Sequence, residues 1–492
     1  MDISSLWSHV NLENENLSFS VVTVCIICAV VLTANVMRRK IPFFRRSLMP
    51  TAVIAGLLGL VVKEIVLSTT GVYIFSRPTL GGLIYHLLPI AFIALCLRDQ
   101  DNYTTEFDRA KVNRERVTAT RSGAVIISTY LVQGMLGILV VGFFALTFMP
   151  DLNPATGIML ALGYGQGPQQ ANATGYIWDA AGYMSAWGPG AARNFGLTIA
   201  GLGFLWASIP GIILVNAIAK KKGMTIVRDE FQKSGDLSSY KIEGPDEVPL
   251  SESIDKFSLQ ICMVGGVYLL TIGLILGIEI GFTATGVPFL VDLVPTIWGF
   301  AFMIAALVAL CAKLILRRLV KSGVMHRKYP NNFMMNRISG VAFDLAIVAA
   351  LCAISVGELG QLWIPVLVMT SVGGLGCMLY LRHLCNYVYK DYKDEAFLAF
   401  YGLLTGTIAN GMILLREIDG EFKTPAGRDL VLGSSSAIVL GIPLLLIIAQ
   451  APRLGNLWWV SLVIVLYFVG LTVFQLKALI FRSKKTKKVG GN

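Results

Sequence analysis

Two glycine-rich stretches hold most of the residues in this chain that could bind a ligand. The first contains GYGQGPQQ at residues 163–170, and the second contains TGT at residues 405–407. Glycine lets the backbone turn sharply and lets a ligand come close, and the free N–H groups at a helix start favour an anion. Carbonyls of unwound backbone suit a hard cation such as sodium. The candidate substrate-binding residues here are Gly163, Gly165, Gln166, Gly167, Gln169, Gln170, Thr405, Gly406 and Thr407.

Two arginines and an aspartate add charge to these candidates. Arg193 and Arg428 each follow one glycine-rich stretch, and a guanidinium can hold a substrate carboxylate through two hydrogen bonds. The alternative is that they anchor the neighbouring backbone. Asp344 lies within an apolar run, where it either binds sodium or pairs with Arg337 at the membrane interface. Three further side chains could supply oxygens to an ion or cap short helices, namely Asn172, Thr174 and Asn410.

The composition indicates a membrane protein. Of the 492 residues, 55% are hydrophobic and only 14% are charged, and the mean hydropathy is +0.68. Soluble domains carry about 25% charged residues. This composition argues against a soluble enzyme, a nucleic-acid-binding protein and a disordered chain.

Eleven apolar runs are long enough to cross a bilayer core of about 30 Å as helices. We therefore predict an all-α polytopic membrane protein. The first run follows a polar, acidic segment rather than a basic one, which predicts an uncleaved helix and not a signal peptide. The runs start near Phe19, Pro50, Leu80, Ser122, Gly196, Phe257, Val287, Ile338, Leu362, Leu430 and Trp458.

The basic residues predict the orientation in the cell membrane. Lysine and arginine follow the first, third, fifth, seventh and last runs, and cytoplasmic loops are the ones enriched in these residues. The N-terminus is then outside and the C-terminus is cytoplasmic. The net charge of +11 therefore indicates topology and attraction to anionic lipid rather than a nucleic-acid partner.

A hydrophilic segment divides the chain into two halves that we expect to be inverted five-helix repeats. An odd number of spans before this linker starts the second half on the opposite side of the membrane. The predicted parts are an extracellular tail at 1–18, a first repeat at 19–219, a cytoplasmic linker at 220–256, a second repeat at 257–450, and an additional helix with a basic tail at 457–492.

Each half contains a stretch that is too polar and glycine-rich for a lipid-facing helix, at about residues 155–192 and 396–426. Irregular backbone lies at membrane depth only where protein or a water-filled cavity covers it. We therefore predict two re-entrant or broken-helix hairpins whose tips could meet near the midplane. The alternative is that the glycines serve close helix packing.

At these residues the chain resembles the glutamate:sodium symporter family over most of residues 19–450. The similar segments are SLMPTAVIAG at 47–56, the loop at 163–167, and the loop at 405–411 with LLRE at 414–417. The resemblance implies two inverted repeats, a sodium-coupled carrier of acidic amino acids, and a homodimer. The chain departs from the family in two ways: its first loop reads GYGQG where the family has Gly-Gly-x-Gly, and its eleventh helix is additional. The substrate could therefore be a carboxylate other than glutamate.

The predicted function is sodium-coupled symport of glutamate or a related carboxylate into the cell. The predicted partners are a small anionic substrate, sodium as the coupling ion and the lipid bilayer, with no other cofactor and no transition-metal site. A proton-coupled or other organic-anion carrier of the same architecture is the alternative. A membrane-embedded enzyme is more remote, because enzymes of that kind gather acids or histidines at a membrane face, whereas the polar residues here gather in two loops.

Overall fold

The computed structural model describes residues 15–46, 48–98, 109–223, 250–324, 330–420, 423–452 and 462–473. Helices dominate these ranges, as an all-α polytopic membrane protein requires, because a helix pairs its own backbone N–H and C=O groups where no water is present. Most of the predicted N-terminal tail, most of the central linker and the basic C-terminal tail lie outside the described residues.

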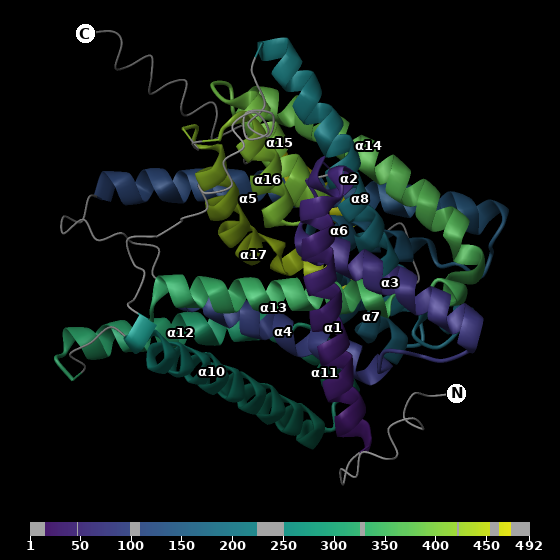
Figure 1. Cartoon of the computed structure of the whole chain (residues 1–492), viewed down its shortest axis with the longest axis horizontal. Coiled ribbons are helices and arrows are strands. Elements are labelled where there is room, and N and C mark those ends of the chain that lie inside the picture. The colour runs from purple at the N-terminus through teal and green to yellow at the C-terminus, as the bar shows by residue number, and fades with distance from the viewer. Residues whose placement is uncertain are drawn as a thin grey trace. The chain divides into compact units, whose positions relative to one another are not determined.

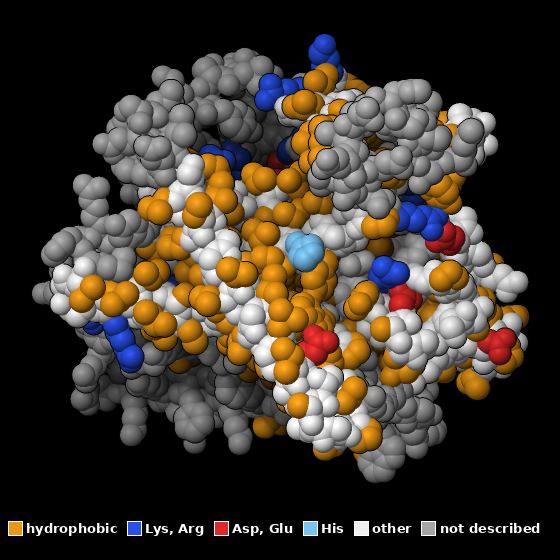
Figure 2. All heavy atoms as spheres, turned by 90° about the horizontal axis from the view of Figure 1, so that it is seen from below, with side chains coloured by type: hydrophobic (Ala, Val, Ile, Leu, Met, Phe, Trp, Pro, Cys, Tyr) orange, Lys and Arg blue, Asp and Glu red, His pale blue; other side chains and the backbone are white. Residues whose placement is uncertain are grey.

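Eight of the described helices are long and apolar enough to cross a bilayer. A ninth span results if α11 and α12 are counted together across a bend of 64°. Two shorter apolar helices follow, Leu440–Gln450 at the end of α17 and Leu462–Val473. On the face in Figure 2, hydrophobic side chains cover much of the described surface and charged ones are sparse, as expected of a surface that meets lipid.

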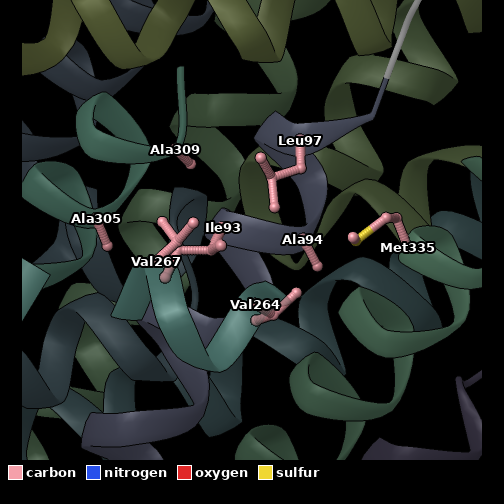
Figure 3. Close-up of a cluster of buried hydrophobic side chains, with 8 residues drawn as sticks. All are labelled: Ile93, Ala94, Leu97, Val264, Val267, Ala305, Ala309 and Met335. Atoms are coloured by element: carbon pink, nitrogen blue, oxygen red, sulfur yellow. The ribbon is translucent and has the colours of Figure 1, made fainter. Parts of the chain in front are cut away.

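By its internal contacts the chain forms two compact units. Unit 1 holds most of α1 (Glu15–Lys40) and α3 (Thr51–Thr70), and all of α4 (Arg77–Leu97), α10 (Leu250–Thr285), α11 (Pro288–Gly299), α12 (Ala301–Lys321) and α13 (Asn332–Ala353). Helix α4 packs against α10, α12 and α13. Buried aliphatic residues from these four helices, including Ile93, Leu97, Val267 and Met335, form its core (Figure 3).

Besides α2 (Pro42–Arg46), the described part of unit 2 includes two long helices, four short ones and two of intermediate length. The long helices are α5 (Arg109–Thr147) and α8 (Ala191–Lys222). The short ones are α6 (Met159–Gly165), α7 (Pro168–Ala180), α15 (Lys393–Thr405) and α16 (Ile408–Ile418), and the remaining two are α14 (Trp363–Val388) and α17 (Ala426–Gln450) (Figure 1). Large buried side chains such as Tyr164, Trp178 and Tyr401 fill the space among these helices, so the short helices are enclosed by protein.

Candidate functional site

The first glycine-rich stretch folds as two short helices separated by a two-residue break. Helix α6 ends at Gly165, Gln166 and Gly167 form the break, and α7 starts at Pro168. Gly167 has φ 86°, a backbone conformation that glycine adopts readily. Proline suits the first helical turn because its missing N–H has no intrahelical partner there. The break therefore brings the carbonyl end of α6 next to the N–H end of α7.

The second stretch repeats this plan. Helix α15 ends at Thr405, Gly406 and Thr407 are non-helical, and α16 starts at Ile408. The Thr407 hydroxyl donates to Asn410 Oδ1 at 2.9 Å, so Asn410 takes part in the structure of the helix start. Each predicted hairpin thus contains one broken helix, and each break exposes both kinds of helix end.

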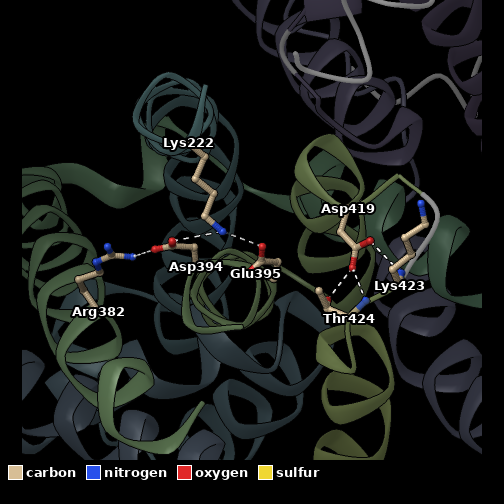
Figure 4. A network of polar contacts seen from close by, with 7 residues as sticks. All are labelled: Lys222, Arg382, Asp394, Glu395, Asp419, Lys423 and Thr424. Carbon is tan, nitrogen blue, oxygen red and sulfur yellow. Dashed lines mark hydrogen bonds and ion pairs between the residues drawn. The ribbon is translucent and has the colours of Figure 1, made fainter. Parts of the chain in front are cut away.

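The two hairpins are attached at opposite ends of α8. At its N-terminal end, Asp179 at the end of α7 accepts from the Ala192 N–H at 3.0 Å and from Arg193 Nε at 2.8 Å. At its C-terminal end, Lys222 contacts Asp394 at 3.3 Å and Glu395 at 2.8 Å, at the start of α15 (Figure 4). The hairpins therefore enter unit 2 from opposite directions.

The broken ends meet partway along α8. A Cβ atom at Gly203 would lie 2.7 Å from the Thr405 carbonyl oxygen and 2.9 Å from the Tyr164 ring, so this glycine lets both hairpins pack against the helix. Gly203 is about 18 Å along α8 from Ala191. A Cβ atom at Gly167 would lie 3.9 Å from Thr407 Cγ2, which places the two breaks in contact with each other.

Helix α5 joins the two breaks through a pair of polar side chains one turn apart. The Tyr130 hydroxyl donates to the Gly165 carbonyl at 2.8 Å, and Gln133 Nε2 donates to the Leu404 carbonyl at 2.7 Å. Both side chains are buried. Each of them satisfies one of the carbonyl groups that a helix end leaves without an intrahelical partner.

Several buried polar atoms of unit 2 lack a hydrogen-bond partner among the described residues. Helix α7, whose N-terminal end faces the first break, carries the largest number of them. Unpaired buried polar groups are uncommon because they lose their hydration, so a cluster of them indicates a place where a ligand, an ion or water binds. The atoms are Arg121 Nε, Gln133 Oε1, Gln169 Nε2, Gln170 Oε1, Thr174 Oγ1, Ser208 Oγ and Asp429 Oδ1.

The electrostatics of the breaks suit two kinds of ligand. The N-terminal ends of α7 and α16 carry partial positive charge, which favours a carboxylate, and the C-terminal ends of α6 and α15 carry partial negative charge, which favours a cation. In the described part of the chain no group of three or more His, Cys, Asp or Glu side chains is arranged to hold a metal ion. The polar groups of the breaks themselves are backbone N–H and C=O groups and the side chains of Gln166 and Thr407.

Most of the predicted site residues lie at these breaks or on α7. Gln166, Gly167, Gly406 and Thr407 form the breaks themselves. The remaining uncharged polar candidates are all buried and belong to unit 2, namely Gln169, Gln170, Asn172, Thr174, Thr405 and Asn410.

Two of the predicted substrate-binding glycines lie in close contact with neighbouring helices. A Cβ at Gly163 would lie 2.6 Å from Ile199 Cγ2, and a Cβ at Gly165 would lie 1.8 Å from Tyr130 Cε1. These glycines therefore let α6 approach α8 and α5, which is the packing alternative that the sequence left open.

Neither predicted substrate-binding arginine lies at a break. Arg193 pairs with Asp179, which is about 16 Å along α7 from Pro168. Arg428 is exposed in the first turn of α17, where the next residue, Asp429, accepts a hydrogen bond from Tyr392 at the start of α15. The structure thus places both arginines beyond the hairpin helices, at the start of the long helices α8 and α17. For Arg193 the geometry favours the anchoring alternative.

The predicted ion ligand Asp344 belongs to unit 1, where it is exposed on α13. It is therefore not among the residues that unit 2 gathers at the breaks. Its suggested partner Arg337 stacks its guanidinium on the Phe333 ring at 4.9 Å.

Sequence reasoning missed Tyr130, Gln133 and Asp179. A glutamine in the middle of an apolar span is costly unless it is paired, and this signal could have identified Gln133. Tyr130 is one turn away on the same helix. Asp179 had no such signal, because an acidic residue at the end of a polar stretch is commonly solvent-exposed.

One charged cluster fixes the base of the second hairpin. Asp394 contacts Arg382 Nη1 at 2.5 Å as well as Lys222 (Figure 4). A separate set of bonds lies beyond α16, where the Asp419 carboxylate accepts from the Lys423 and Thr424 N–H groups. Burial alone would raise the pKa of the Asp394 carboxyl, but its hydrogen bonds and the charges of Arg382 and Lys222 lower it. Asp394 therefore stays ionised and holds α8, α14 and α15 together.

No protein-family model matches this chain, and a search of curated proteins finds no significant match.

Proposed function

We propose that this multi-pass membrane protein is a secondary transporter that carries glutamate or a related carboxylate into the cell together with sodium. The observation that supports this most is the meeting of two broken helices, attached at opposite ends of α8, beside Gly203. Broken helices of this kind are how many secondary transporters bind ions and solutes within a membrane.

The substrate carboxylate would bind at the N-terminal ends of α7 and α16. Free backbone N–H groups there can donate to it, and Gln169 Nε2 is a buried amide donor without a partner among the described residues. Amide donors recognise a carboxylate without adding a buried charge when the site is empty. Such a site suits a carrier, which must release its substrate as well as bind it.

Sodium would bind at the carbonyl ends of α6 and α15. Oxygen ligands at short range suit this hard cation, and the partial negative charge of a helix C-terminus adds to the attraction. A cation beside a carboxylate reduces the cost of burying either charge alone, so joint binding is favoured over separate binding.

The proposed membrane arrangement has eleven spans in two inverted five-helix repeats, with the N-terminus outside. The opposite entry of the two hairpins supports the inversion. The three consecutive lysines at the end of α8, Lys220 to Lys222, support a cytoplasmic location for that end and therefore for the base of the second hairpin. The first hairpin would then enter from outside.

A proton-coupled carrier is a second candidate, and one observation favours it. Asp429 on α17 is fully buried, its Oδ2 lies 3.6 Å from Arg121 Nη2, and its Oδ1 has no hydrogen-bond partner among the described residues. A half-satisfied buried carboxylate is a group that can take up a proton.

Uptake into proteoliposomes tests the proposal. Purified protein would be reconstituted, and labelled glutamate uptake would be measured under an inward sodium gradient, an inward proton gradient, or neither. We expect accumulation only with the sodium gradient, enhanced by an inside-negative potential. Accumulation that persists after the sodium gradient is collapsed would refute sodium coupling, and accumulation with the proton gradient alone would favour the second candidate.

A further inference from the structure

Gln133 on α5 presents a buried oxygen that the structure leaves without a hydrogen-bond partner. Its side chain is fully buried, and Oε1 has no partner among the described residues. Gln133 belongs to neither hairpin and to neither glycine-rich stretch. It nevertheless contacts the second break directly, through the bond from Nε2 to the Leu404 carbonyl at 2.7 Å.

The orientation of this amide is fixed by its nitrogen. Nε2 carries two hydrogens, and it donates to Leu404 O and, at 3.4 Å, to Cys377 Sγ. Exchanging the amide nitrogen and oxygen would place Oε1 against the Leu404 carbonyl, and two acceptors would then repel each other. Oε1 is therefore the atom that is left over, and it lies beside the C-terminal end of α15.

We infer that Gln133 Oε1 is a ligand of the coupling cation, an inference that rests on the proposed function. A cation there would have the amide oxygen on one side and the partial negative charge of the α15 carbonyl end on the other. Neutral oxygens of this type are ligands for a hard monovalent ion in transporters. The ion site would then join α5, which spans unit 2, to the break of the second hairpin.

This assignment explains why the amide and the broken helix are joined. When the cation binds, it pulls Oε1, and the same amide holds Leu404 through Nε2. The position of the α15 end is thereby linked to cation binding, and so is the start of α16 at Ile408. Cation occupancy would then prepare the N–H groups of α16 for the carboxylate.

The test compares two substitutions that remove the same donor but differ in oxygen. Gln133→Met keeps the side-chain length and has neither Nε2 nor Oε1. Gln133→Glu loses the donor to Leu404 but keeps an oxygen at the ion. If Gln133 is a ligand, we expect Gln133→Met to raise the sodium concentration for half-maximal uptake by about tenfold, as is typical when a metal site loses a supporting group. Gln133→Glu places a second acceptor against the Leu404 carbonyl but keeps an oxygen at the ion, so it should raise that concentration clearly less than Gln133→Met does.

The matched control is Thr129→Val on the same helix. Thr129 is fully buried, and its hydroxyl donates to Val125 O within α5. The substitution keeps the side-chain shape and tests whether any buried polar change in α5 alters sodium dependence. We expect wild-type sodium dependence for this variant.

A readout independent of transport is the thermal unfolding midpoint of the purified protein as sodium replaces choline at constant ionic strength. Wild type and Gln133→Glu should be stabilised by sodium, and Gln133→Met should not. If Gln133→Met does not fold, Gln133→Asn, which withdraws the oxygen by one methylene, takes its place with the same expectation.

Three outcomes would count against these ideas in distinguishable ways. A wild-type sodium dependence in Gln133→Met would overturn the inference while the proposed function stands. Equal loss in the Met and Glu variants would also overturn it, because the Leu404 bond and not the oxygen would then matter. Wild-type protein that neither takes up glutamate with sodium nor is stabilised by sodium would overturn the proposed function and the inference with it.

Discussion

A methyl group added at Gly165 would test whether close contact between α6 and α5 holds the first break in place. In Gly165→Ala the new Cβ would lie 1.8 Å from Tyr130 Cε1 and 2.6 Å from Tyr130 Cδ1. Carbon atoms in contact are about 3.5 Å apart. The Tyr130 ring or the α6 backbone must therefore move by roughly 1.7 Å, the difference between those two distances. Either movement would stretch the bond from the Tyr130 hydroxyl to Gly165 O, which is 2.8 Å long.

The expected cost has two parts. Overpacking a well-packed interior costs about 1–3 kcal/mol, and loss of the hydrogen bond adds about 0.5–1.5 kcal/mol. We therefore expect Gly165→Ala to lower the free energy of unfolding by about 1.5–4.5 kcal/mol. Uptake should fall with it, because Gly165 is the last residue of α6 before the break. Thermal unfolding in detergent and proteoliposome uptake would measure the two effects.

Two further variants make the reasoning refutable. In Gly265→Ala on α10 the added Cβ would have no described atom within 4 Å, so this control should be neutral or stabilised by up to about 1 kcal/mol through better helix propensity. Tyr130→Ala removes the clashing ring, so adding Gly165→Ala to it should cost much less than it does alone. If Gly165→Ala unfolds like wild type, or if its cost is the same with and without Tyr130, the packing argument is wrong.

The remaining predictions concern charged residues. Asp179→Ala should destabilise the protein by about 1–3 kcal/mol, because it leaves the Ala192 N–H unpaired. Arg193→Gln removes only a half-exposed ion pair and should cost under about 1 kcal/mol. Thermal unfolding would measure both effects. Arg193→Gln should also leave the KM for substrate unchanged, and a large rise would restore this arginine to the binding site. Asp394→Asn should lower the unfolding midpoint more than Glu395→Gln, because Asp394 contacts both Arg382 and Lys222; equal midpoints would contradict this. If the protein is proton-coupled, Asp429→Asn should abolish the pH dependence of uptake, and an unchanged pH profile would remove Asp429 from that role.

Part of the candidate site could be predicted from the sequence, because glycine, proline and small polar residues strongly affect where helices start and end. Gly167 and Pro168 mark the first break, and Gly406 marks the second, where the structure interrupts the helices. The role of each glycine could not be predicted from the sequence. Gly165 and Gly167 are two residues apart, yet the first is packed against Tyr130 and the second makes the turn. Only the neighbours on other helices distinguish these roles.

The distance of Arg193 and Arg428 from the breaks could not be predicted from the sequence. Arg193 and Arg428 follow the two glycine-rich stretches at similar distances, and the sequence allowed both to reach a ligand. Each hairpin, however, continues for ten or more residues after its break before the next long helix begins. Helical rise carries the chain away from the break at about 1.5 Å per residue. The arginines therefore lie at the hairpin bases, a result that requires knowing that the chain continues as a helix, α7 or α16, after each break.

What the sequence determined alone is the class of protein and the position of its two irregular segments. Sparse charge and long apolar runs require helices in lipid, since an unpaired backbone is too costly there, and this holds whatever the tertiary arrangement. The tertiary structure decided which groups meet: that the breaks lie beside Gly203, that Tyr130 and Gln133 reach them from α5, and that Asp179 and Asp394 tie the hairpins to opposite ends of α8. These contacts join residues that are distant in the chain. Which residues meet depends on how the helices pack, and the helices have similarly apolar sequences.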